Sequence, residues 1–183
     1  MAIFFDTATT LDGYLADDED SLAWLFAVPG GDSPSPELAP GPAAVMVEGS
    51  HTYEWVLRDQ DLLAHPERWA AFHGDTPVFV FTTRELPAPA GADVRFVRGS
   101  VEDALPAIRA AAGDGDIWLV GGGDLVGQFD DAGALDELRL SYAPATLGSG
   151  APLLPRRLGA ERLSLESVAR VGAFARLVYR VSR

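Results

Sequence analysis

The chain has 183 residues, of which 48% are hydrophobic and 22% are charged, a balance typical of folded globular proteins that excludes wholesale disorder. Acidic residues number 27 and basic residues 14, so the formal charge of −13 argues against nucleic-acid partners and anionic membrane surfaces. Cysteine is absent, which excludes disulfides, thiolate nucleophiles and cysteine-based zinc sites. Asp6 and Asp12 interrupt the first apolar run, and no apolar stretch is long enough for a membrane span, so we expect a cytoplasmic protein. Its length predicts one domain over residues 1–183.

The first half of the chain alternates predicted strands with predicted helices. Strands are predicted at residues 3–9, 43–47, 77–82 and 93–97, and helices at 21–26, 50–57 and 66–72. The continuous apolarity of residues 77–82 suits a strand that is covered on both faces. Residues 28–42 are dense in Pro, Gly and Ser, and we interpret them as a flexible surface loop within the domain.

The second half ends in strands without intervening helices. Ser100 predicts the start of a helix that ends at Gly113, and Pro106 predicts a late start or a distortion of that helix. A buried strand at 116–120 and a helix at 124–132 follow, and then strands at 135–143, 163–170 and 174–182. We expect the strands after residue 132 to be antiparallel, with a terminal hairpin around Gly172. The order predicts a three-layer α/β/α domain with a sheet that is parallel at first and mixed at its C-terminal end.

The strongest local signal for chemistry is a strand followed by Gly121, Gly122 and Gly123 and then by a helix. Glycines let a phosphate approach the backbone, and a helix N-terminus offers free N–H groups, so one interpretation is a cofactor phosphate at residues 121–125. The other is a tight turn or close packing of strand and helix. A Rossmann fingerprint would need glycine at position 126, where Val126 stands, and a parallel strand after the helix, so we disfavour it.

Other candidate sites carry weaker signals. His51, His65 and His73 lack the spacing of metal ligands, so we expect no metal site and interpret them as surface or hydrogen-bonding residues. Residues 17–20 form an acidic run that favours a solvated loop over a cation site. Asp12 is either the first residue of an Asp-Gly turn or a carboxylate that anchors substrate or transfers a proton.

Six segments, taken in chain order, carry a family resemblance. They are residues 9–16 (TTLDGYLA), 22–25 (LAWL), 49–54 (GSHTYE), 117–123 (IWLVGGG), 135–140 (LDELRL) and 144–148 (PATLG). Together they resemble the dihydrofolate-reductase-like family, in the branch that includes the C-terminal reductase domain of riboflavin-biosynthesis deaminase/reductase proteins. The resemblance implies a mixed, mostly parallel eight-stranded sheet with antiparallel C-terminal strands, flanked by helices, and a homodimer.

The resemblance also implies NADPH lying across the carboxyl ends of the central strands. By position, three groups of residues would bind it: Gly121, Gly122, Gly123, Asp124 and Leu125 at the pyrophosphate; Gly49, His51 and Thr52 from a second helix; and Thr82, Thr83 and Arg84 at the adenosine ribose. Arg84 is the candidate for the 2′-phosphate, and the Gly121–Gly122 peptide bond would be cis. Asp12 is the candidate catalytic residue, near the nicotinamide and the substrate.

The implied activity is NADPH-dependent reduction of a pteridine, pyrimidine or related heterocycle by direct hydride transfer, of the 5-amino-6-(5-phosphoribosylamino)uracil reductase type. The chain departs from the family pattern at Ser50, where Arg is usual, at Ser21, where dihydrofolate reductases carry a carboxylate, and at Val120, where riboflavin reductases often have Glu. These departures leave the substrate and the choice between NADPH and NADH open. Two alternatives are a nucleotide-binding or sensing module without catalysis and a structural protein whose glycines serve packing alone.

Overall fold

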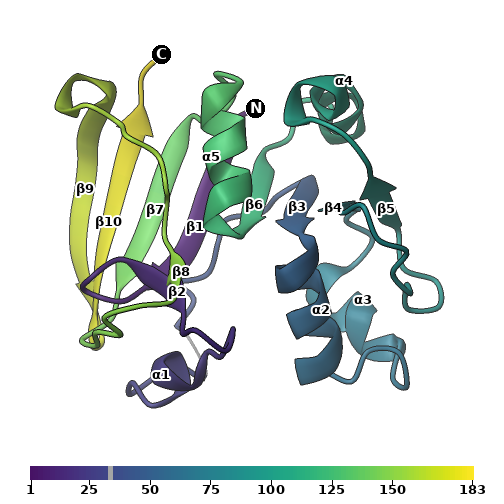
Figure 1. Cartoon of the computed structure of the whole chain (residues 1–183), viewed down its shortest axis with the longest axis horizontal. Coiled ribbons are helices and arrows are strands. Elements are labelled where there is room, and N and C mark those ends of the chain that lie inside the picture. Colours follow the sequence, from purple (N-terminus) through teal and green to yellow (C-terminus); the bar gives the residue numbers. More distant parts are fainter. Residues whose placement is uncertain (33–34) are drawn as a thin grey trace.

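A mixed eight-stranded sheet forms the centre of the protein. The computed structural model describes residues 1–32 and 35–183, so residues 33 and 34 of the predicted loop lie outside it. The sheet comprises β1 (Ile3–Thr9), β3 (Val45–Gly49), β4 (Val78–Phe81), β5 (Val94–Val97), β6 (Ile117–Gly121), β7 (Glu137–Tyr142), β9 (Leu163–Val171) and β10 (Phe174–Val181). Its strand order is β5-β4-β3-β6-β1-β7-β10-β9 (Figure 1). A second, two-stranded sheet joins β2 (Tyr14–Ala16) to β8 (Ala151–Pro152).

Helices cover both faces of the large sheet, as the alternation of its apolar residues requires. They are α1 (Ala23–Phe26), α2 (Ser50–Asp59), α3 (Glu67–His73), α4 (Val101–Ala112) and α5 (Gly123–Asp131), with a 3₁₀ turn at Ala160–Arg162. Phe5 of β1 belongs to the core that packs under α4 and α5, whereas its neighbour Phe4 belongs to the core under α2 and α3. The predicted three-layer α/β/α arrangement is therefore confirmed. Within the described residues, no helix combines the length and apolarity that crossing a bilayer requires.

The direction of one strand differs from the prediction. β7 runs parallel to β1, with Phe4 opposite Glu137 and Thr9 opposite Tyr142. Antiparallel pairing begins only at β10, which lies between β7 and β9. The expectation that every strand after residue 132 is antiparallel was therefore wrong for β7, because α5 carries the chain back across the sheet before that strand begins. The terminal hairpin of β9 and β10 is confirmed.

Three smaller features also differ from the expectations. The two short strands β2 and β8 were not predicted. The α4 helix begins at Val101, directly after its N-cap Ser100, and runs through Pro106, so the expected late start was wrong. His73 is buried rather than at the surface, and its ring stacks on Trp69 with 3.7 Å between ring centroids. Burial lowers the pKa of His73 to about 4, so its imidazole is neutral at physiological pH.

Candidate functional site

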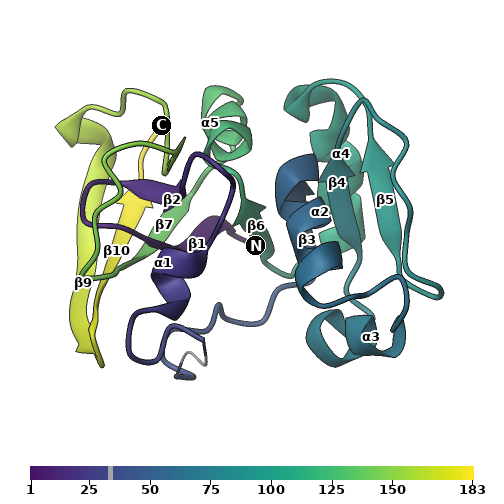
Figure 2. The same ribbon diagram turned by 60° about the horizontal axis from the view of Figure 1, so that its bottom comes forward.

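A cavity of about 650 Å³ opens where β1, β3, β4 and β6 end. Beyond these carboxyl ends α1 lies on one side and α2 on the other (Figure 1; Figure 2 gives a second view). This is the edge of an α/β sheet at which ligands generally bind. Its volume lies within the range of small-molecule and cofactor sites. The chain's main cavity therefore lies where the resemblance implied a cofactor.

Two helix N-termini meet at one end of this cavity, which we call the glycine end and define by Gly49, Gly121, Gly122, Asp124 and Leu125. The N-caps of α2 and α5 are Gly49 and Gly122, which have no side chain to accept from the first-turn N–H groups. The first intrahelical bond of α5 runs from Val126 N to Gly122 O. Amide groups in the first turns of both helices therefore remain available to an anion.

The glycines of this turn have different roles. A Cβ on Gly122 would meet no atom within 4 Å and would project into open space, whereas a Cβ on Gly123 would lie 2.3 Å from the carbonyl oxygen of Pro152. Gly122 therefore leaves room for a ligand, and Gly123 permits close packing against β8. The Gly121–Gly122 peptide bond is cis, as the resemblance implied. Both interpretations of the three glycines, ligand binding and packing, thus hold at different positions.

Asp124 brings a negative charge to the first turn of α5. Its carboxylate accepts hydrogen bonds from Gln128 Nε2 at 3.0 Å and from Arg156 Nη1 at 3.0 Å. These bonds lower the pKa of Asp124, so the carboxylate is ionised, and Arg156 offsets part of its charge. Because Gln128 and Arg156 already bind this side chain, the first-turn amides rather than Asp124 are the groups suited to a phosphate.

Thr82 and Thr83 line the cavity beside Gly99, but the neighbouring Arg84 does not. Thr82 Oγ1 accepts a hydrogen bond from Arg84 N at 3.0 Å, which shapes the turn after β4. The Arg84 guanidinium instead binds both carboxylate oxygens of Glu54 on α2. The structure thus brings the two threonines to the site and holds the predicted phosphate ligand at its edge.

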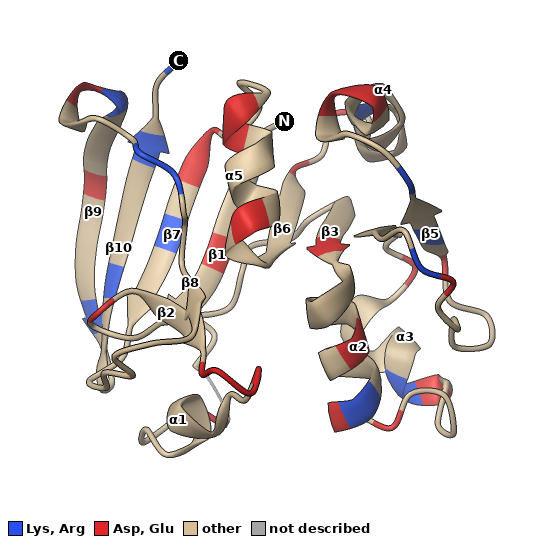
Figure 3. Cartoon of the chain, in the orientation of Figure 1, with Lys and Arg blue, Asp and Glu red and all other residues tan. Residues whose placement is uncertain are grey.

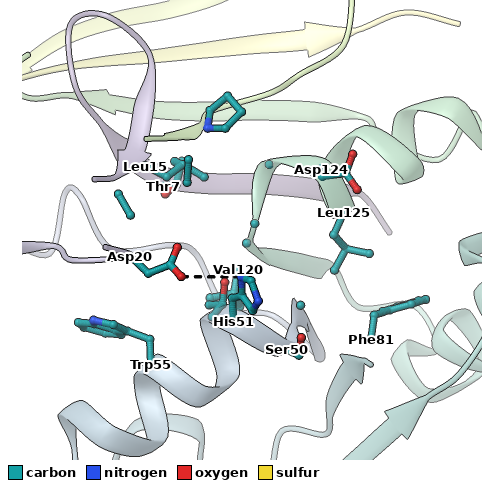
Figure 4. Close-up of a pocket in the computed structure, with 18 of the residues that line it drawn as sticks. Thr7, Leu15, Asp20, Ser50, His51, Trp55, Phe81, Val120, Asp124 and Leu125 are labelled. Carbon is teal, nitrogen blue, oxygen red and sulfur yellow. Dashed lines mark ion pairs between the residues drawn. The ribbon is translucent and has the colours of Figure 1, made fainter. Parts of the chain in front are cut away.

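The opposite end, which we call the aromatic end, is defined by Asp20, Leu22, Trp24, Leu25, His51 and Trp55. Figure 4 shows Asp20 and Trp55 on one side of the cavity, and Phe81 and Leu125 on the other. His51 Nδ1 lies 3.9 Å from Asp20 Oδ2, and the Trp55 ring stacks on Phe26 with centroids 6.3 Å apart. These two contacts connect α2 to the segment that carries α1. Sequence reasoning missed this end except for His51, and the two tryptophans were its only available signal.

Asp12, the predicted catalytic residue, does not line the cavity. Its exposed carboxylate accepts hydrogen bonds from Thr10 Oγ1, from Leu147 N and from Gly148 N, the last at 2.7 Å. The Thr10 bond contributes most to lowering the pKa of Asp12, so the group remains an ionised acceptor. The geometry supports the alternative that Asp12 is a turn residue, here one that fastens the β1–β2 turn to residues 147–148. Ten of the twelve predicted site residues line the cavity, and Asp12 and Arg84 lie outside it.

A buried carboxyl group lies next to the glycine end. Glu48, on β3 directly before Gly49, is 2% exposed, and its Oε1 accepts no hydrogen bond from the described residues. Burial raises the pKa of Glu48 to about 8, so the side chain is protonated at neutral pH. Its place in the sheet, opposite Gly121, makes it part of the framework under the glycine turn. No pattern in the sequence set this Glu apart.

Comparisons with known proteins agree with this architecture. The uncharacterized protein YyaP of Bacillus subtilis is 27% identical over 156 residues, which cover 82% of this chain and 79% of YyaP. A putative riboflavin biosynthesis protein from Shewanella sp. PV-4 superposes with a TM-score of 0.76 at 24% identity, over the full length of both chains. The diaminohydroxyphosphoribosylaminopyrimidine deaminase/5-amino-6-(5-phosphoribosylamino)uracil reductase of Thermotoga maritima has a TM-score of 0.66 at 17% identity. That match covers 99% of this chain and 56% of the Thermotoga protein.

The structural neighbours establish the dihydrofolate-reductase-like fold that the resemblance implied, with its mostly parallel sheet and antiparallel C-terminal strands. At the level of sequence, residues 2–174 match the family described as the RibD C-terminal domain, which is nearly the whole chain. This family supports an oxidoreductase of the type found in riboflavin biosynthesis. The chain belongs to the RibD C-terminal domain family.

Proposed function

We propose that this protein is an NADPH-dependent reductase that transfers a hydride directly to a pteridine, pyrimidine or related heterocycle. The observation that carries the proposal is the glycine end, where α2 and α5 open their uncapped N-termini onto one cavity. A dinucleotide pyrophosphate carries the negative charge that such termini favour. Membership in a family with riboflavin-pathway reductases adds support.

The residues present fit this cofactor. Gly122 leaves space that a Cβ would fill, and the amides of the first turns of α2 and α5 supply donors for the phosphates. Thr82 and Thr83 offer hydroxyl groups for a ribose at the far side of the glycine end. When bound, the cofactor supplies the hydride. The chain's own part is to orient the two reactants and to exclude water from the apolar walls that Leu15 and Val120 contribute.

The first test is a titration with NADPH and with NADH that follows quenching of the four tryptophans. We expect saturable binding with NADPH preferred about tenfold, equivalent to ~1.4 kcal/mol. Oxidation of NADPH in the presence of a panel of heterocycles then tests turnover. Cofactor binding without turnover would favour the alternative of a sensing module. Failure of both nucleotides to bind would reject the proposal and leave the glycines with a packing role alone.

A further inference from the structure

The aromatic end of the cavity contains no group suited to a phosphate. All 14 basic residues of the chain are arginines, and among the described residues none of them lines the cavity. The fixed charge at this end is the carboxylate of Asp20, with His51 beside it. A small adjoining hollow adds Glu19 and Asp59 against a single arginine, Arg58. Figure 3 shows the same imbalance as an acidic segment next to α1. This end therefore repels anions.

Backbone donors at the aromatic end are also occupied. The amides of Glu19 and Ser21 both donate to Asp17 Oδ1, at 2.9 and 2.8 Å. Ala23 N donates to Ser21 Oγ at 3.1 Å, and Leu25 N donates to Leu22 O at 2.9 Å. With four residues, α1 is too short to act as an anion-binding helix. The two means by which proteins usually hold a phosphate, cationic side chains and free amides, are therefore lacking in this part of the described chain.

The groups that are present favour a flat and uncharged or cationic ligand. Trp24 and Trp55 border this end, and indole rings stack on planar rings and attract cations over their faces. Trp24 is held in place because its Nε1 donates to Leu15 O at 3.2 Å. Leu22 and Leu25 supply the remaining apolar wall. The free amides at the glycine end are separate from this wall and are assigned to the cofactor.

We propose that the substrate is a planar heterocycle that carries no phosphate or carboxylate and is neutral or positively charged, bound between Trp24 and Trp55. This inference rests on the proposed function, because it assigns the glycine end to the cofactor. It separates the protein from reductases whose substrates carry a phosphoribosyl group. Asp20 adds to the selection, because its carboxylate attracts a protonated ring and repels a phosphorylated one.

The test compares one heterocycle with and without a phosphate. In the full-length protein saturated with NADPH, 5-amino-6-ribosylaminouracil and its 5′-phosphate are titrated separately, again by tryptophan fluorescence. We expect the unphosphorylated compound to bind at least tenfold more tightly. Equal or tighter binding of the phosphate, or binding of neither compound, would overturn the inference while the proposed function stands. Failure of NADPH itself to bind would overturn both.

A matched pair of variants tests the location. Leu22→Arg places a cation at the aromatic end and is expected to narrow the preference against the phosphate at least tenfold. Leu63→Arg puts the same charge on a leucine that is 51% exposed and outside the cavity, and it should leave the preference unchanged. An unaltered preference in Leu22→Arg, with NADPH binding intact, would show that the substrate does not lie at this end. An equal change in both variants would reject the location as well.

Discussion

The guanidinium of Arg84 lies flat against the carboxylate of Glu54, with a hydrogen bond to each oxygen, and so joins the turn after β4 to the side of α2. Arg84 is the residue that the family resemblance assigns to the cofactor's 2′-phosphate. In this arrangement a phosphate would have to compete with Glu54 for the guanidinium, because an arginine fork binds one planar anion at a time.

This competition makes opposite predictions for the two partners. Glu54→Gln frees the guanidinium, so we expect the preference for NADPH over NADH to rise about tenfold, or ~1.4 kcal/mol. Arg84→Ala should abolish the preference and leave NADH binding unchanged. Fluorescence titration of both nucleotides checks each result. Arg98, which is 63% exposed near the same turn, provides the control variant Arg98→Ala. If Arg84→Ala keeps the wild-type preference, the assignment of the 2′-phosphate is wrong.

Filling the glycine end should block the cofactor. Gly122 has an extended backbone that accepts a side chain (φ −82°), and its Cβ would point into open space. We therefore expect Gly122→Val to weaken NADPH binding by at least a hundredfold. Gly41→Val is the matched control, because its Cβ would make only an ordinary contact, at 3.7 Å from Arg139 Nη1. Unchanged affinity in Gly122→Val would rule out a pyrophosphate at this turn.

Glu48 predicts an unusual dependence of stability on pH. Burial raises its pKa in the folded protein to about 8, whereas the unfolded chain has the ordinary value of 4.5, so unfolding releases a proton between these values. The contribution is fully favourable below pH ~4.5 and is lost as the pH rises to about 8, at up to about 1.4 kcal/mol per pH unit. Urea denaturation from pH 5 to 8 measures this slope. Glu48→Gln should flatten it, and Glu85→Gln, at a side chain that is 95% exposed, should not.

The ion pair between Asp6 and Arg176 is buried, whereas that between Glu166 and Arg180 is exposed. Arg176 bridges β10 to β1, and its Nη1 also donates to Ser141 Oγ at 3.0 Å on β7. Arg176→Met leaves the Asp6 carboxylate, which is 5% exposed, without its cation, and we expect a loss of about 3–5 kcal/mol in unfolding free energy. Arg180→Met should cost less than about 1 kcal/mol. Similar losses in both variants would contradict this assignment.

The edge strand β9 supports the proposal of a homodimer. Leu165 and Val168, which are 54% and 63% exposed, lie opposite Tyr179 and Leu177, so the four side chains form one apolar face. We expect light scattering to give twice the chain mass of 19.4 kDa, and Val168→Asp to return it to 19.4 kDa. The control Ser167→Asp places the same charge on the opposite face. A wild-type mass of 19.4 kDa would reject the dimer.

The sequence was most informative where residues signal through their neighbours in the chain. Apolar runs marked the large strands, and three consecutive glycines marked the turn before α5. The direction of β7 could not be predicted in the same way, because its register with β1 joins residues more than 130 positions apart, such as Phe4 and Glu137. β2 and β8 have three and two residues, too few for a periodic pattern.

The same limit applied to the site. The glycine end was predictable because each of its parts follows a recognisable strand. The aromatic end brings together Trp24 and Trp55, which are 31 positions apart on separate elements, and nothing local in the chain connects them. The pairing of Arg84 with Glu54 was equally hidden, because a charge does not reveal its partner.

The central place of β1 in the sheet has a consequence for how the protein acquires its structure. β1 is made first on the ribosome, yet its two neighbours are β6 and β7, whose residues begin at Ile117 and Glu137. Its apolar side chains must wait unpaired until more than two thirds of the chain has been synthesised. Pairings across such long sequence separations fold slowly and expose the nascent strand to aggregation. We therefore expect yield in cells to depend on chaperones that hold the emerging N-terminal segment.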